Sequence, residues 1–190
     1  LVKVPLYTYA LSGRDTTVWI NRVLQRVGEP PVIYDEGLAE RSRRNIEQML
    51  VNDGYLHATV DFACEKREKK KRAVATYYLH ERERYYVSDI TLNTADSALS
   101  SLVDLTSEES LLRPGMPFSV DGMEQERNRL TKLFRDKGYY RFQKDYITFT
   151  ADTSHHSNKV DLTMNIAMFV PSSNDSTVAH KSYRIGDIYY

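Results

Sequence analysis

The sequence is short of cysteine, of net charge and of long apolar runs. Its 190 residues include one cysteine, Cys64, which excludes an internal disulfide. The 26 basic residues balance the 26 acidic ones, so the chain as a whole has no field that would attract nucleic acid or anionic membranes. No apolar run approaches the roughly 20 residues that a membrane-spanning helix needs. The hydrophobic fraction of 41% is nevertheless sufficient for folded cores.

Catalytic and metal-binding motifs are also missing from the sequence. It contains neither G-x-S-x-G nor a glycine-rich phosphate loop. His155 and His156 are neighbours, so on a strand they would point to opposite faces, and the H-x-x-x-H spacing of a metal site does not occur. Cys64 falls at the same alternating positions as the apolar Ala58, Val60 and Phe62, which is typical of a buried structural thiol. We therefore predict that the chain is not an enzyme and needs neither metal nor cofactor.

The first half of the chain predicts two helices followed by a hairpin. Apolar residues recur at helical spacing from Thr16 to Val27, before a Gly-Glu-Pro-Pro stop. Asp35 has the position of an N-cap for a second helix, which should end at Gly54. Alternating runs over 58–65 and 73–79 then predict two antiparallel strands.

The second half repeats this order. A strand, a short helix, a long helix and two more strands are expected over 85–92, 98–103, 119–138, 147–151 and 160–166. Phe142 is out of phase with Ile147, which predicts a bulge or a twisted entry into the first of these last two strands.

The two halves match when one is shifted by 84 positions. Each matched pair keeps its physical role as staple, cap, apolar stripe or helix stop. The pairs are Tyr34/Phe118, Asp35/Ser119, Arg43/Arg127, Ile46/Leu130, Met49/Leu133, Leu50/Phe134, Gly54/Gly138 and Tyr55/Tyr139. A tandem array of strand–helix–helix–strand–strand units follows from this repetition.

A third unit is expected to begin near the end of the sequence. The spacing of Tyr85, Val87 and Ile90 recurs at Tyr183, Ile185 and Ile188, about 98 residues later. The domains predicted are therefore 1–84, with a lead-in over 1–13 and an uncertain opening strand, then 85–170, a flexible linker over 171–181, and the first strand of a truncated third module over 182–190. Both ends fall inside patterned segments, so we expect the chain to be a piece of a longer protein.

Each of the two complete modules should have its own hydrophobic core. The first is predicted to include Trp19, Ile46, Leu50, Val60 and Phe62. The second is predicted to include Leu130, Phe134, Ile147 and Leu162.

This order resembles the POTRA repeat, which forms a periplasmic array ahead of the membrane barrel in outer-membrane-protein assembly and translocation factors. The resemblance is carried by GMPFSVDGMEQERNRLTKLFRDKGYYRF, by KVDLTMNI and by the Y-x-[VI]-x-x-I openings at Tyr85 and Tyr183. It extends from about Thr16 onward. The lead-in is similar, more narrowly, to TamL-type members of the BamA/TamA superfamily in Bacteroidetes. Members usually place a glycine after an acidic residue at the end of the last strand, whereas Glu81 is followed here by Arg82.

The resemblance implies a fold and a role. The fold would be α+β, with tandem β-α-α-β-β modules, each a three-stranded mixed sheet covered on one face by two helices. The role would be to bind unfolded client proteins at the periplasmic face of the bacterial outer membrane and to pass them to a membrane β-barrel. Implied partners are unfolded outer-membrane proteins, the C-terminal β-barrel and further POTRA modules of the same chain, and other assembly-machine subunits, without nucleic acid.

The resemblance also implies where clients would bind. The middle strand of each module in sequence, Leu56–Lys66 or Arg141–Asp152, would lie at a sheet edge. An open edge offers unpaired N–H and C=O groups to an extended chain, although every open sheet has such edges for structural reasons alone. The candidate residues for client binding are Thr59, Asp61, Ala63 and Glu65.

A cluster of six positive charges offers an alternative function. It occupies the predicted hairpin tip and consists of Lys66, Arg67, Lys69, Lys70, Lys71 and Arg72. Such a tip could grip phosphates in a nucleic-acid-binding or anionic-surface-binding module. It has no interleaved aromatic residues for base stacking, and a run of charges is ordinarily a solvated turn. Salt-dependent binding of the protein to a DNA column would favour the nucleic-acid alternative.

Overall fold

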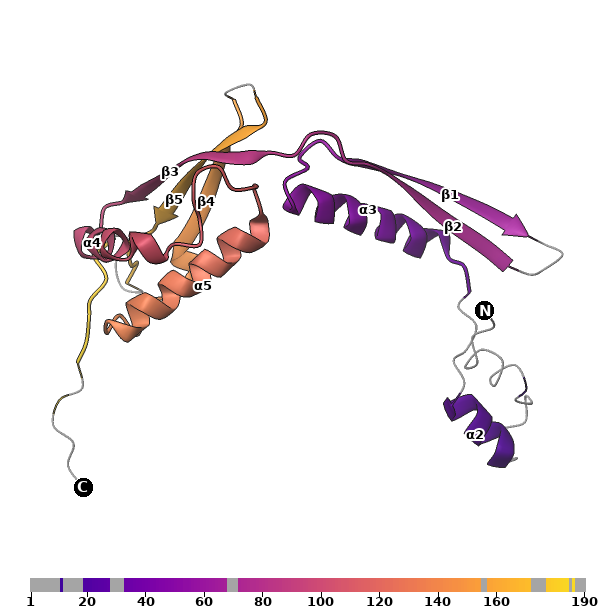
Figure 1. Cartoon of the computed structure of the whole chain (residues 1–190). Helices are drawn as coiled ribbons and strands as arrows, with labels where there is room; N and C mark the ends of the chain where they lie inside the picture. Colours follow the sequence, from indigo (N-terminus) through magenta and orange to yellow (C-terminus); the bar gives the residue numbers. More distant parts are fainter. Residues whose placement is uncertain are drawn as a thin grey trace. The chain divides into compact units, whose positions relative to one another are not determined.

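The computed structural model describes residues 19–27, 33–67, 72–154, 157–171 and 177–184, together with Leu11 and Gly186 (Figure 1). It divides into two compact units, one of residues 1–42 and 63–76 and the other of residues 43–62 and 77–190. The helices are α2 (Trp19–Val27), α3 (Glu36–Asn52), α4 (Ser97–Leu105) and α5 (Val120–Asp136). The strands are β1 (Thr59–Arg67), β2 (Arg72–His80), β3 (Tyr86–Thr94), β4 (Ile147–Asp152) and β5 (Lys159–Ile166).

Helix α3 and the β1–β2 hairpin form where local signals predict them. The Asp35 carboxylate accepts a hydrogen bond from the backbone N–H of Leu38 at 2.8 Å, which caps α3. The helix stops at Gly54, whose φ of +97° lies in the left-handed region that favours glycine. Strands β1 and β2 pair in a two-stranded sheet. The third, opening strand expected for this half falls on residues outside the described part of the chain.

The predicted first core is wrong in its most prominent member. Trp19 has 69% of its surface exposed, and its neighbours Ile20 and Val23 are each 48% exposed. The apolar stripe of α2 therefore meets no covering surface among the described residues. Val60 is buried, as predicted, but the other three expected core residues, Ile46, Leu50 and Phe62, are only half-buried. Cys64, predicted to be a buried thiol, is also half-buried.

Residues 85–166 contain a mixed three-stranded sheet. Strand β5 lies at its centre, parallel to β3 and antiparallel to β4. Along β5 the buried side chains recur at every second position, at Val160, Leu162, Met164 and Ile166. Helices α4 and α5 cover the face that these side chains form, as Figure 1 shows. The α+β fold predicted from the sequence is therefore confirmed.

The core of this sheet-and-helix layer matches the prediction for the second half. Leu130, Phe134 and Ile147 have no exposed surface, and Leu162 is 1% exposed. A second apolar cluster, centred on Val87, Phe118 and Val160, lies at the other end of the same sheet. The most completely buried side chains of the described chain thus lie in this half.

Phe142 departs from its prediction. It belongs to no strand, because the chain turns at Phe142 and forms a short 3₁₀ helix over Lys144–Tyr146 before β4 begins. Its ring is fully buried and packs edge-on against Phe134, with ring centroids 4.8 Å apart. The irregularity that the sequence pattern assigned to a bulged strand is therefore a turn with an anchored aromatic ring.

Arg82 occupies the position where the resemblance leads us to expect glycine. Its φ is +55°, within the left-handed region. A β-carbon disfavours this conformation by roughly 1–2 kcal/mol. The connection after β2 therefore keeps the backbone shape of a glycine turn while carrying an arginine.

The chain after β5 folds back onto the same unit. Phe169 and Val178 exchange two backbone hydrogen bonds of 2.9 Å. His180 is buried, donates its backbone N–H to the Asp96 carboxylate at 2.8 Å and lies against the rings of Phe142 and Tyr146. The expected flexible linker over 171–181 is thus anchored at His180, whereas residues 172–176 lie outside the described part.

Candidate functional site

The outer edge of β4 is the best candidate for a binding surface. Strand β4 pairs on one side with β5, from Ile147 opposite Ile166 to Asp152 opposite Asp161. Its other side faces no strand in the described residues, because β5 holds the centre of the sheet. The middle strand in sequence thus lies at a sheet edge, which is the place that the resemblance implies for Arg141–Asp152.

The hydrogen-bond pattern identifies the backbone groups that point outward. Just before β4, the N–H of Ala167 donates to the carbonyl of Tyr146 at 2.8 Å. In an antiparallel ladder, successive residues point their backbone groups alternately toward and away from the partner strand. Tyr146 points toward β5, so Ile147, Phe149 and Ala151 point away from it. The N–H of Ile147 is used by the carbonyl of Lys144 in the short helix. Phe149 and Ala151 therefore present both N–H and C=O outward.

A groove of about 260 Å³ runs between this edge and α5. Met123 of α5 and Ile147 of β4 are buried residues at its base, and Phe149 is half-buried beside them. Val120 and Thr148 complete its apolar and small polar lining. The groove can accept side chains of a chain that pairs with β4, since alternate side chains of such a chain point toward the helix layer.

Charged groups also line the groove, at Glu124 and Arg127. Glu124 accepts hydrogen bonds from Lys144 and from Arg127, both at 2.7 Å. The bond from Lys144, together with the charge and hydrogen bond of Arg127, lowers the pKa of the Glu124 carboxyl below its usual value, although partial desolvation opposes this. Arg127 also donates to the backbone carbonyl of Lys144 at 3.1 Å, which joins α5 to the entry of β4.

The four residues predicted for client binding are brought together on one strand. Thr59, Asp61, Ala63 and Glu65 are all exposed on β1, where they alternate with Val60, Phe62 and Cys64. Asp61 pairs with His80 at 3.1 Å, and Glu65 pairs with Arg67 at 3.1 Å. Their role in binding remains a prediction.

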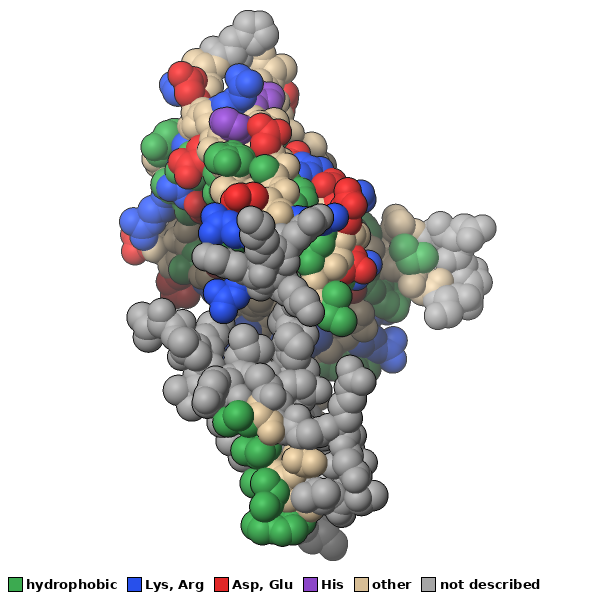
Figure 2. Space-filling model, turned by 90° about the vertical axis from the view of Figure 1, so that its right-hand side faces the viewer, with side chains coloured by type: hydrophobic (Ala, Val, Ile, Leu, Met, Phe, Trp, Pro, Cys, Tyr) green, Lys and Arg blue, Asp and Glu red, His purple; other side chains and the backbone are tan. Residues whose placement is uncertain are grey.

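The basic hairpin tip is only partly described. Lys66, Arg67 and Arg72 lie at the ends of β1 and β2, while Lys69, Lys70 and Lys71 lie outside the described residues, as do His155 and His156. The Lys66 ammonium lies over the Tyr34 ring, 5.7 Å from its centroid. Figure 2 shows basic and acidic side chains interspersed over the coloured surface on this view, without a large area of one sign.

The described residues contain neither a candidate metal-binding cluster nor a candidate membrane-spanning helix. No group of three or more His, Cys, Asp or Glu side chains converges there in a way that could hold a metal ion. None of the described helices has the length and apolarity required to cross a membrane.

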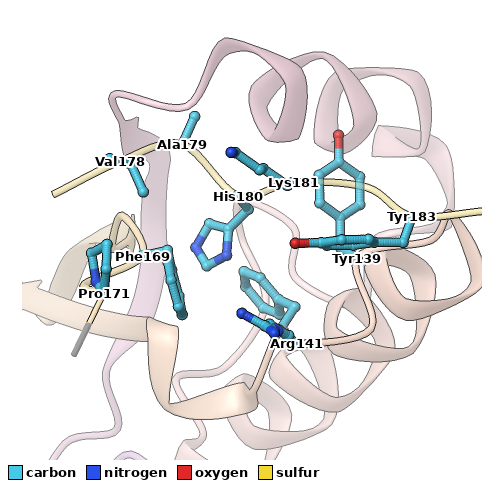
Figure 3. A pocket seen from close by; sticks show the side chains of 10 residues that line it. Tyr139, Arg141, Phe169, Pro171, Val178, Ala179, His180, Lys181 and Tyr183 are labelled. Atoms are coloured by element: carbon cyan, nitrogen blue, oxygen red, sulfur yellow. The ribbon is translucent and has the colours of Figure 1, made fainter. Parts of the chain in front are cut away.

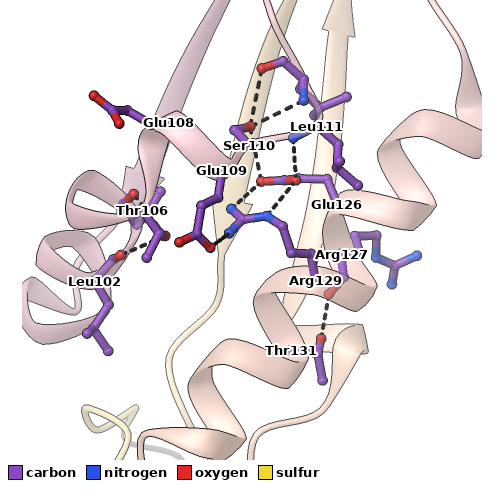
Figure 4. A network of polar contacts seen from close by, with 12 residues as sticks. Leu102, Thr106, Glu108, Glu109, Ser110, Leu111, Glu126, Arg127, Arg129 and Thr131 are labelled. Carbon is purple, nitrogen blue, oxygen red and sulfur yellow. Dashed lines mark hydrogen bonds and ion pairs between the residues drawn. The ribbon is translucent and has the colours of Figure 1, made fainter.

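Glu126 is a buried carboxylate that the sequence pattern did not single out. Glu126 of α5 is 2% exposed and accepts bonds from the Ser110 hydroxyl, the Leu111 N–H and the Arg129 guanidinium (Figure 4). Its hydrogen bond and charge raise the pKa of Arg129 above the usual value, against partial desolvation. Glu126 lies three residues after Met123 and four before Leu130, so its place on the apolar stripe was a usable signal. The network pins the loop before α5 rather than forming a reactive site.

Comparisons with known proteins found similarity in solved structures alone, since no protein-family model and no curated protein matches the chain. A crystal structure of BamA from Haemophilus ducreyi lacking POTRA domains 1–3 is 19% identical, with a TM-score of 0.46, over 73% of this chain and 24% of that one. A crystal structure of POTRA domains 3–5 of Haemophilus influenzae BamA is 16% identical, with a TM-score of 0.42, over 73% of this chain and 50% of that one.

A third match is the N-terminal domain of Omp85 from the cyanobacterium Thermosynechococcus elongatus. It is 13% identical with a TM-score of 0.28, over 82% of this chain and 63% of that one. The matched part of the present chain thus spans less than two thirds of each of the three structures. The α+β assignment stands on the strand order and helix positions described above.

Proposed function

We propose that the chain is part of the periplasmic POTRA region of an outer-membrane assembly factor of the BamA/TamA superfamily, most like its TamL-type members. It binds unfolded outer-membrane proteins by β-strand augmentation and passes them to a membrane β-barrel. The observation that carries this proposal is the open edge of β4, with Phe149 and Ala151 presenting outward backbone groups beside an apolar groove. The ordered sequence resemblance supports the choice of family.

Binding follows from the geometry of the edge. An extended client aligns beside β4 and forms backbone hydrogen bonds with Phe149 and Ala151. The side chains of the client alternate between the two faces of the enlarged sheet, so every second one enters the groove at Met123 and Ile147. Backbone bonds do not depend on client sequence, and a groove with apolar walls accepts many side chains. A strand destined for a membrane barrel alternates polar and apolar residues and therefore suits this surface.

The same mode is proposed for β1. Thr59, Asp61, Ala63 and Glu65 are exposed there, and β1 belongs to a sheet in which β2 is its partner among the described strands. In this proposal the two halves of the chain offer a client successive edges, and the exposed charges of Asp61 and Glu65 select against closely apposed acidic segments.

The test replaces Ala151 with proline. Ala151 is exposed, and its N–H faces away from β5, so proline removes an outward donor without removing a bond of the ladder. We expect Ala151→Pro to weaken binding of a labelled peptide with alternating polar and apolar residues by about three- to tenfold, the effect of one hydrogen bond. Ala151→Val is the matched control, because it keeps the N–H and favours a strand.

Circular dichroism must first establish that both variants fold. A folded Ala151→Pro protein that binds the peptide as tightly as Ala151→Val would contradict augmentation at β4. Corresponding proline variants from Thr59 to Glu65 test β1 in the same assay. Unchanged binding across all of them would remove that strand from the proposal.

A further inference from the structure

A pocket separate from the β4 edge lies where the chain folds back after β5. It occupies about 220 Å³ between the turn that follows α5 and the returning segment around His180 (Figure 3). Its walls are mainly aromatic, with the buried rings of Phe142 and His180 at the base and Phe169 and Tyr183 at the sides. A cavity of about 150 Å³ can hold a benzene ring. This pocket therefore has room for one aromatic or branched apolar group and a short linker.

Two polar groups of His180 at the base of the pocket already have hydrogen-bond partners. The backbone N–H of His180 is bonded to Asp96, and its Nε2 lies 3.0 Å from the carbonyl oxygen of Ala167. Its ring also packs against those of Phe142 and Phe169. His180 is thus a fixed wall, and it brings no net negative charge to the pocket.

The opening of the pocket carries two cations. Arg141 and Lys181 are exposed, and neither forms an ion pair with a carboxylate in the described residues. The Nε of Arg141 donates to the Tyr140 hydroxyl at 2.8 Å, which fixes the position of the guanidinium and leaves its terminal nitrogens available. The Tyr183 hydroxyl points toward the His180 side of the pocket, where it can add a hydrogen-bond donor (Figure 3).

We infer that this pocket binds a carboxylate joined to one aromatic or branched apolar group. The apolar group fills the space between Phe142, Phe169 and Tyr183, and the carboxylate pairs with the Arg141 guanidinium at the opening, while Lys181, on the other side of His180 in Figure 3, adds a second positive charge to the rim. This chemistry is shared by the C-terminal residue of a peptide and by free aryl carboxylates. The volume favours a single ring over a long acyl chain. The inference goes beyond client binding at the strand edges and does not depend on it.

The experiment uses the whole chain and four small probes. These are 3-phenylpropionate, its neutral counterpart 3-phenylpropanol, N-acetyl-phenylalanine and N-acetyl-phenylalaninamide. Binding is followed by chemical-shift changes in two-dimensional NMR spectra. We expect both acids to bind with a dissociation constant on the order of 1 mM, as is usual for ligands of this size. The shifts should centre on the backbone amides of His180 and Tyr183, and the two neutral probes should bind at least about tenfold more weakly.

Two variants locate the site. Arg141→Met combined with Lys181→Met should weaken binding of the acids by about tenfold, while Lys132→Met on the exposed face of α5 should leave it unchanged. Ala179→Phe places a ring in the pocket opening and should abolish binding without entering the buried core.

Each outcome is decisive. Equal binding of the acids and the neutral probes would overturn the inference, and so would chemical-shift changes centred away from His180. It would also be overturned if the double methionine variant bound the acids as tightly as wild type does. No detectable binding by either acid would overturn it too. If N-acetyl-phenylalanine binds more tightly than 3-phenylpropionate, the pocket accepts a peptide terminus. The reverse order assigns it to free aryl carboxylates.

Discussion

Arg127 donates from its guanidinium to the backbone carbonyl of Lys144, 3.1 Å away and 17 residues later. Arg43 makes the equivalent bond to the carbonyl of Val60, also at 3.1 Å and across 17 residues. Both pairs join a long helix to the start of the strand that we propose as a client-binding edge. The 84-position match in the sequence thus has a counterpart in side-chain geometry.

Removing this bond should loosen the strand entry. We expect Arg127→Met to lower the free energy of unfolding by about 1–2 kcal/mol, because it leaves the Lys144 carbonyl without a charged donor and Glu124 with one partner fewer. Urea titration measures the change. Lys132→Met, at an exposed position of the same helix, controls for loss of charge, and an equal effect of the two substitutions would contradict the assignment.

Burial predicts different costs at two matched core positions. Leu130 is fully buried, whereas Ile46 is half-buried. Leu130→Ala should therefore lower stability by roughly 2–5 kcal/mol. Ile46→Ala should cost about half as much or less, because part of its surface is already in water. Chemical denaturation of both variants gives the comparison, and a larger loss of stability at Ile46 than at Leu130 would contradict this dependence on burial.

Gly138 combines two constraints that can be separated. Its φ is +97°, and a β-carbon there would lie 2.5 Å from the Tyr183 carbonyl oxygen. Gly115 has a φ of +86° with nothing within 4 Å of the same position. Gly115→Ala should therefore cost about 1 kcal/mol from backbone conformation alone, and Gly138→Ala should cost clearly more. Equal melting temperatures for the two variants would contradict a close approach at Gly138.

The left-handed arginine offers a stabilising substitution. Arg82→Gly should raise stability by about 0.5–1 kcal/mol, because relief of the β-carbon strain exceeds the greater freedom of glycine in the unfolded chain. Arg82→Ala keeps the β-carbon and should bring no such gain. Thermal unfolding of the two variants distinguishes backbone strain from the loss of the arginine charge.

Acid should weaken the ion pairs that Glu124 forms beside the groove. Lys144 and Arg127 lower the pKa of Glu124 below its usual 4.5 in the folded chain. Its contribution is therefore present above the unfolded pKa and is lost as pH falls through the folded pKa. Between neutral pH and pH values below about 4.5, wild type should lose more stability than Glu124→Gln. An equal loss of stability in the two proteins between neutral and acidic pH, measured by chemical unfolding, would contradict this coupling.

Local signals predicted the elements of the second half well. Ser119 caps α5 by accepting a hydrogen bond from Gly122, and Gly138 follows its end, because both features depend on residues close in sequence. Burial was harder to predict. Trp19 has the spacing of a core residue, yet its burial requires a covering element that periodicity does not specify. Phe142 is buried from a turn, where no alternation exists to reveal it.

The candidate sites show the same division. The resemblance implied an edge at the strand that is β4, whereas the groove beside it depends on how Met123 and Phe149 meet across two elements. The pocket at His180 was hidden in a segment that composition alone describes as a polar linker. The contacts of His180 with Asp96 and Phe142, which composition does not specify, return this segment to the core.

The left-handed glycines have a consequence for how such a chain can change length. The N–H of Tyr85 donates to the carbonyl of Gly54 at 2.9 Å, and that of Tyr183 donates to Gly138 at 2.8 Å. For the predicted repeat, a gene recombination that fused the residues up to and including Gly54 to those after Gly138 would delete 84 residues and keep one left-handed glycine, with its carbonyl, at the helix stop. Unequal crossing-over at this point would change the length of the chain in steps of 84 residues while a glycine stays at the junction.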